Sequence, residues 1–169
     1  MAEDRTDRLG LPLLMAGQAQ KEVTHNEALV RLDIAACAAV ESADVAVPPG
    51  VPLIGQCWIV AAGASAAWSG HEGDVAGWTS GGWRFVSPVL GMEVWVADRG
   101  HAMRWGSGTW SDGAIRADGV YQNGVRVVGT QGDAIAAPAG GITVDVESRA
   151  AINAILEMLR LHGLIASTL

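Results

Sequence analysis

The stretch Trp78-Thr-Ser-Gly-Gly-Trp83 decides the fold, because it returns as Trp105-Gly-Ser-Gly-Thr-Trp110. In both copies two tryptophans flank a Gly/Ser turn, which is typical of a tight β-hairpin whose rings pair across the strands. A looser match precedes each copy, where Gly55-Gln-Cys-Trp58-Ile-Val aligns with Gly91-Met-Glu-Val-Trp95-Val. The sequence therefore predicts a duplicated Trp-rich β-hairpin module over residues 53–112, with about 20 to 30 residues in each copy.

All seven tryptophans of the chain lie inside this module. We expect Trp58 and Trp95 to belong to the core, because each is centred in an apolar strand. Trp68 lies in a loop that only the first copy carries, where burial and exposure are equally open. An exposed indole ring offers a flat apolar face to a sugar or to a partner protein. The candidate residues for such a contact are Trp68, His71, Trp83 and Trp110.

A helix is predicted over residues 17–42, which contain no proline and are rich in Ala, Leu, Glu and Gln. Val23, Val30, Ile34 and Cys37 recur at helical steps along one face. A second apolar set on another side consists of Leu29, Leu32, Ala36 and Val40. We therefore expect this helix to meet more than one surface, one of them on another subunit.

The C-terminal part carries clear local signals. Asn123-Gly124 stands between β-branched runs, which predicts a hairpin over residues 120–128. A last helix begins after Asp145, a suitable N-cap, and ends before Gly163, which suits the C′ position of a Schellman motif. The candidate oligomer or docking residues of the two helices are Gln20, Val23, His25, Val30, Ile152, Ile155 and Leu159.

These elements predict a mainly β fold with α, in which a small Trp/Gly-rich β-hairpin repeat module is flanked by an N-terminal and a C-terminal helix. The expected segments are an N-terminal arm and helix (1–47), the Trp-rich module (53–112), a hairpin and loop (113–144), and the C-terminal helix and tail (145–169).

Composition excludes several classes of protein. The 169 residues are 50% hydrophobic, which argues against a disordered chain. A net charge of −7 argues against nucleic-acid binding, because a phosphate backbone requires clustered Lys and Arg. The apolar runs are too short for membrane insertion, and the charged N-terminus does not resemble a secretory signal. We expect a soluble protein made in the cytoplasm.

No motif points to catalysis. His71-Glu72-Gly73-Asp74 could suggest a metal, but no second ligand group stands at a defined spacing. Nucleophile elbows and phosphate-binding loops are absent from the sequence. A polysaccharide-cleaving enzyme would require two carboxylates across a cleft, which sequence spacing does not reveal. We expect no enzymatic activity, no cofactor and no metal.

Three stretches together resemble a phage-derived family, a domain of unknown function found in tail fibres and head spikes of prophages and gene transfer agents. The stretches are Arg8–Leu14 with Ala16–Ala28, the Trp/Gly repeat ending at Gly82–Pro88, and the tail Ala150–Ile165. The similarity covers nearly the whole chain. No catalytic residues are known for the family, and this chain lacks the long repetitive shaft of fibre members.

The resemblance implies a virion structural protein, the oligomeric base or adaptor that attaches a receptor-binding fibre to a particle. It implies a homo-oligomer, trimeric or pentameric, on the surface of a virion or gene transfer agent made in the bacterial cytoplasm. The implied partners are capsid, portal-proximal or tail proteins and a separate fibre protein. The alternative is a carbohydrate-binding module that recognises host surface polysaccharide through its tryptophans.

Overall fold

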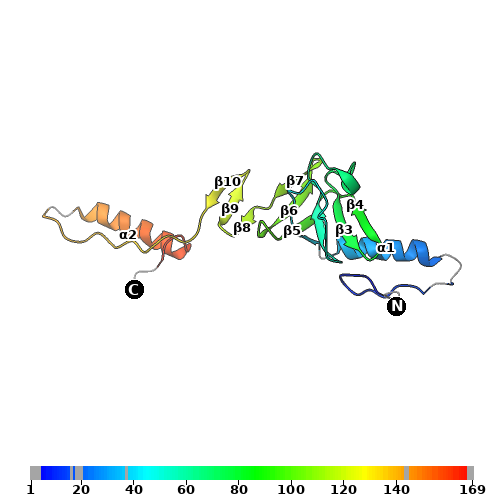
Figure 1. Ribbon diagram of the computed structural model, residues 1–169. Coiled ribbons are helices and arrows are strands. Elements are labelled where there is room, and N and C mark those ends of the chain that lie inside the picture. Colours follow the sequence, from blue (N-terminus) through cyan, green and yellow to red (C-terminus); the bar gives the residue numbers. More distant parts are fainter. Residues whose placement is uncertain (1–4, 16, 18–20, 37, 143–144, 167–169) are drawn as a thin grey trace. The chain divides into compact units, whose positions relative to one another are not determined.

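The computed structural model of the chain describes residues 5–15, 17, 21–36, 38–142 and 145–166 (Figure 1). The chain forms two compact units, Met1–Gly113 and Ala114–Leu169. The first unit holds the N-terminal helix and the Trp-rich strands, and the second holds a small sheet and the C-terminal helix. The predicted fold class, mainly β with a helix toward each end of the chain, is confirmed.

The elements of the first unit are α1 Lys21–Ala35, β1 Ala39–Val40, β2 Cys57–Ile59, the short 3-10 helix η1 Ala66–Trp68, β3 Val75–Thr79, β4 Gly82–Val86, β5 Glu93–Val96, β6 His101–Gly106 and β7 Thr109–Asp112. One sheet has the order β2-β3-β4 and the other has the order β1-β5-β6-β7. All neighbours are antiparallel except β1, which runs parallel to β5.

The duplication predicted from the Trp repeat is present in the strand pairing. Trp78 lies opposite Trp83 in the hairpin β3–β4, and Trp105 lies opposite Trp110 in the hairpin β6–β7. The ring centroids are 4.9 Å apart in the first pair and 5.4 Å apart in the second. Each copy is thus a three-stranded antiparallel meander that carries one cross-strand Trp pair beside its second turn.

Helix α1 is shorter than the sequence predicts. It ends at Ala35, and Ala39–Val40 form the strand β1 instead of a further helical turn. Val40 is opposite Val96 in the parallel pairing and is only 3% exposed. Burial and strand hydrogen bonds in this sheet therefore outweigh the helical propensity of the segment. Gln20 and Cys37 lie outside the described residues.

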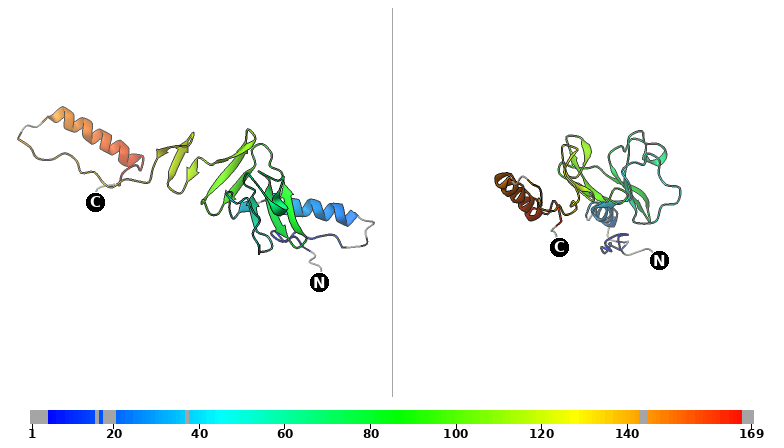
Figure 2. Two further views of the ribbon diagram at one scale, coloured as in Figure 1. Left: turned by 45° about the horizontal axis from the view of Figure 1, so that its top comes forward. Right: turned by 90° about the vertical axis from the view of Figure 1, so that its left-hand side faces the viewer.

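The main core lies where α1 and the two sheets meet. Helix α1 packs against β3 and β4 near its C-terminal end (Figure 2), and its Ile34 side chain lies directly over Gly77. A Cβ on Gly77 would be 2.6 Å from Cδ1 of Ile34, so only a glycine permits this close approach. The buried residues of this core are Ile34, Val40, Cys57, Ile59, Val75, Val94, Val96 and Met103.

A second cluster covers the other face of the first sheet, and Trp68 lies at its centre. Trp68 belongs to η1 in the loop between β2 and β3, and it has no exposed surface. Its ring centroid is 6.0 Å from that of Trp58 and 5.1 Å from that of Trp83. Of the two possibilities that the sequence left open for Trp68, the structure shows burial. Trp58 is buried as well, which confirms its predicted place in the core.

The expected burial of Trp95 is wrong, because 51% of this residue is exposed. In the first copy, Trp58 pairs with Ala76, which stands two positions before Trp78. In the second copy, Trp95 pairs with Ala102, which stands three positions before Trp105. Successive side chains of a strand point to opposite faces, so one additional residue turns Trp95 away from the core. The outward face of β5 carries this ring.

The segment before α1 is anchored by a buried carboxylate. Asp33 of α1 accepts hydrogen bonds from the hydroxyl of Thr6 and from the backbone N–H groups of Arg8 and Leu9, at 2.7–2.9 Å. A buried carboxylate is stable only when its oxygens are bonded in this way. Asp33 therefore fixes the path of the N-terminal segment along the helix.

The elements of the second unit are β8 Ile115–Arg116, β9 Gly119–Gln122, β10 Val125–Val128 and α2 Val146–Leu161. The predicted hairpin is confirmed as β9–β10, and its turn residues Asn123 and Gly124 have φ angles of 51° and 79°. Two successive left-handed residues are the hallmark of a type I′ turn, which suits this Asn-Gly pair.

The predicted ends of the C-terminal helix are confirmed as well. The side chain of Asp145 accepts a hydrogen bond from the backbone N–H of Ser148 at 2.8 Å. At the other end Gly163 has φ +68°, and the N–H of Leu164 donates to the carbonyl of Leu159 at 2.9 Å. This bond is the one that defines a Schellman motif.

Candidate functional site

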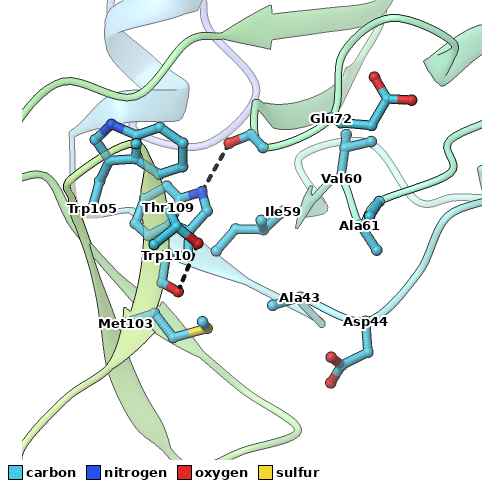
Figure 3. Close-up of a pocket in the computed structure, with 13 residues that line it drawn as sticks. Ala43, Asp44, Ile59, Val60, Ala61, Glu72, Met103, Trp105, Thr109 and Trp110 are labelled. Atoms are coloured by element: carbon cyan, nitrogen blue, oxygen red, sulfur yellow. Dashed lines mark hydrogen bonds between the residues drawn. The ribbon is translucent and has the colours of Figure 1, made fainter. Parts of the chain in front are cut away.

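A cavity of about 430 Å³ opens at the surface of the first unit, and we call it the Trp groove (Figure 3). One wall is formed by the hairpin β6–β7 and carries the paired rings Trp105 and Trp110. The other wall is formed by the segments that follow β1 and β2 and the segment that precedes β3. This second wall includes Asp44, Val60 and Glu72.

Both rings of the Trp groove are held against the loop that precedes β3. The indole N–H of Trp110 donates to the carbonyl oxygen of Gly73 at 2.8 Å. A Cβ on Gly73 would lie 3.4 Å from Cη2 of Trp105, so the edge of that ring covers this glycine. Rings fixed in this way are preorganised for a ligand, because little freedom is lost when the ligand binds.

A charged network holds Asp44 at the groove. Its carboxylate accepts hydrogen bonds from the guanidinium of Arg99 at 2.6 and 3.3 Å. Arg99 also binds Asp112 at 2.7 Å, and the hydrogen bond to Asp44 raises the pKa of the Arg99 guanidinium. The side chain of Asp44 remains 64% exposed, so its oxygens are still open to a ligand.

Glu72 is the second carboxylate of the groove. It is exposed, and no hydrogen bond or ion pair joins it to another described residue. Figure 3 places Glu72 and Asp44 on the side of the groove away from the two tryptophans, with the Glu72 carboxylate at the outer rim. The groove therefore combines an apolar aromatic wall with hydrogen-bond acceptors on the facing side, a combination typical of small-molecule sites.

Of the residues predicted to contact a glycan or partner, only Trp110 lines the Trp groove. Trp83 packs in the second cluster with Trp68, whose buried ring offers no face to a ligand. His71 stacks on Phe85 with ring centroids 3.6 Å apart, and its Nδ1 is 2.9 Å from a carboxylate oxygen of Asp74. These three predicted residues therefore do not form one site with Trp110.

Sequence reasoning missed Trp105, Asp44 and Glu72. A signal for Trp105 was present, because the repeat places it opposite Trp110. No local signal marks Asp44, since Arg99, which holds it, is 55 positions away along the chain. In the sequence, Glu72 stands out only as part of the stretch His71-Glu72-Gly73-Asp74, which could suggest a metal.

The predicted docking residues fall into two groups. On α1, Val23 and His25 are exposed, whereas Val30 packs against the core of its own unit. On α2, Ile152 and Ile155 are exposed and Leu159 is partly buried. We call Ile152, Ile155, Met158 and Leu159 the α2 stripe, because they follow one another along one side of the helix.

Within the described ranges, the His, Cys, Asp and Glu side chains form no group of three or more that could hold a metal ion. None of the helices in the described part of the chain is long and apolar enough to cross a membrane.

Residues 25–111, just over half of the chain, match the model of a family described as "Protein of unknown function (DUF2793)". A search of curated proteins found no match. The matched region includes most of α1, both three-stranded meanders except the last residue of β7, and the whole Trp groove, whereas α2 lies outside it.

Proposed function

The chain belongs to the DUF2793 family, whose function is unknown, and we propose that it is a virion structural protein. In this role it is the oligomeric base or adaptor of a phage-like head spike or tail fibre and attaches a receptor-binding fibre to the particle. The proposal assigns the chain no catalytic activity.

The observation that supports this role is the uncovered α2 stripe. Ile155 is 58% exposed, and Met158 and Ile152 are exposed beside it. The adjoining face of α2 packs in its own unit, where Leu156 is buried and Arg149 donates to the carbonyl of Pro138. Burying one such apolar side chain is worth about 1.5–3 kcal/mol, so the stripe favours association with another chain.

The first experiment measures oligomeric state by size-exclusion chromatography with light scattering. We expect a closed homo-oligomer, three-fold or five-fold, because appendages of particles are rotationally symmetric. Ile155→Lys should dissociate it. Asn153→Lys adds the same charge at another exposed position of α2 and should leave the oligomer intact. A wild-type chain that stays monomeric at high concentration would contradict the proposed assembly.

The second experiment tests whether the chain is located on the surface of a particle. A tagged chain is expressed in the bacterium that carries the gene, and particles are purified on a density gradient. We expect the tag to band with intact particles and to be accessible to antibody on their surface, beside capsid, portal-proximal or tail proteins. A tag that remains entirely in the cytoplasmic fraction would refute the virion role.

Carbohydrate binding is a second candidate function, and the Trp groove favours it. Tryptophan faces stack on the C–H faces of sugars, and the groove presents two such residues at the surface. A glycan array or a pull-down with host capsule tests this function for the whole chain. Binding to no glycan, together with association with particles, would leave the structural role alone.

A further inference from the structure

The two copies of the repeat differ in whether their own loop supplies a ring that covers the Trp pair. In the first copy, residues 60–74 connect β2 to β3 and supply Trp68, whose ring packs on Trp83. In the second copy, only residues 97–100 connect β5 to β6, and they contain no aromatic residue. The pair Trp105–Trp110 therefore has no ring from its own loop to cover it, and it faces the Trp groove.

We propose that the Trp groove binds a neutral pyranose unit of a polysaccharide, stacked on Trp105 and Trp110 and hydrogen-bonded by Glu72 and Asp44. The inference rests on the carbohydrate-binding function proposed above and gives it a site and a class of sugar. In the second copy the sugar would pack on the Trp pair, as the Trp68 ring packs on Trp83 in the first copy.

The shape and chemistry of the groove suit a sugar ring. A volume of about 430 Å³ lies inside the range of about 300–1,000 Å³ that is usual for small-ligand sites. A pyranose presents a flat C–H face, which matches the indole wall, and a rim of hydroxyl groups, which donate to carboxylate oxygens. The hydrogen bond from Trp110 to Gly73 and the ion pair of Asp44 with Arg99 keep both walls in place before binding.

The charges of the groove select a neutral sugar over an acidic one. Both charged side chains among the lining residues, Asp44 and Glu72, are carboxylates. Arg99, the nearby cation, is already bonded to Asp44 and Asp112. The carboxylate of a uronic acid would lie close to these two carboxylates, and like charges repel each other, so we expect the groove to bind an acidic sugar more weakly than a neutral one.

Titration of the full-length chain with defined oligosaccharides tests the site, with tryptophan fluorescence and calorimetry as readouts. The neutral probes are maltohexaose, cellohexaose, isomaltohexaose and chitin hexamer, and the acidic probe is a galacturonic acid hexamer. We expect at least one neutral probe to bind in the micromolar to millimolar range and the acidic probe to bind more weakly than it. Failure of all four neutral probes, or tighter binding of the acidic probe, would overturn the proposal.

Two pairs of variants locate the binding. Trp105→Ala should weaken binding of the neutral probe by about tenfold or more, because the sugar loses the indole face on which it stacks. Trp95→Ala is the matched control, since this exposed ring lies on the other face of the same sheet. Ala62→Trp should block the groove without changing the core, because Ala62 is exposed and lines the groove. Ala67→Trp is its matched control: it lies in the same loop outside the groove and should leave binding unchanged.

Each outcome separates the site from the function. If the wild-type chain binds a neutral probe and neither Trp105→Ala nor Ala62→Trp weakens it, carbohydrate binding holds and the assignment to the groove fails. The Ala62→Trp pair remains decisive if Trp105→Ala does not fold. Oligomerisation and particle association are measured separately, so their failure would leave the sugar site standing.

Discussion

Replacement of Gly77 by alanine tests the packing that holds α1 on the sheet. The added Cβ would lie 2.6 Å from Cδ1 of Ile34, 2.8 Å from its Cγ1 and 3.3 Å from Sγ of Cys57. Carbon atoms in good contact are about 3.5–4.0 Å apart, so a shift of about 1 Å is needed. Ile34 is only 2% exposed, so its side chain cannot turn out into solvent without leaving the core. We expect Gly77→Ala to lower the free energy of unfolding by about 1–3 kcal/mol, as overpacking does.

The assay is urea denaturation followed by tryptophan fluorescence. The matched control is Gly106→Ala, because Gly106 also lies in a strand, and a Cβ there would meet nothing within 4 Å. This control should change the free energy of unfolding by less than about 1 kcal/mol in either direction. The difference between the two variants isolates the contact with Ile34 from the general effect of glycine replacement.

A double-mutant cycle completes the test. Ile34→Val removes Cδ1, the atom closest to the new Cβ, and alone should destabilise the chain by about 0.5–1.5 kcal/mol. The double variant should be destabilised by less than the sum of the two single effects. Ile34→Val removes the atom with which the new Cβ clashes, and the new methyl group fills the space that this atom leaves. Strict additivity, or wild-type stability of Gly77→Ala, would refute the close approach of α1 to β3.

Three further predictions follow from buried or capping groups. Trp68→Ala should lower the free energy of unfolding by about 3–5 kcal/mol in urea melts, and a loss below about 1 kcal/mol would contradict the burial of this ring. Burial raises the pKa of the Cys57 thiol to about 11, so iodoacetamide at pH 8 should modify a Cys37→Ser variant much faster in urea than when folded, and equal rates would disprove the protection. The hydrogen bond from the backbone N–H of Ser148 holds the pKa of Asp145 in the folded chain below its usual 3.8. The ionised carboxylate therefore stabilises α2 fully at any pH above the pKa of Asp145 in the unfolded chain. This stability is lost as the pH falls through the lower pKa of the folded chain. Circular dichroism should therefore show a loss of helix below about pH 3.8, and Asp145→Ala should have less helix at neutral pH and lack this acid step.

The features that the sequence predicted correctly are those with local causes. The turn at Asn123 and the cap at Asp145 each depend on a few adjacent residues, and the structure has both. Trp95 and the end of α1 were mispredicted because both depend on pairing with distant strands. Of the Trp groove, the sequence indicated Trp110, but the position of Asp44 depends on a side chain far along the chain.

If the proposed sugar site is correct, the first copy of the repeat contributes mainly to stability and the second copy to binding. In the first copy, Trp68 closes the Trp pair, and the cluster gains the free energy of burying several rings. In the second copy, the short connection leaves Trp105 and Trp110 half-buried, so part of that gain is forgone. An incompletely covered aromatic pair stabilises a fold less than a closed one, and the proposed sugar would cover the surface that remains. On the proposed particle surface, such a groove would bring the adaptor itself into contact with the polysaccharide of the host.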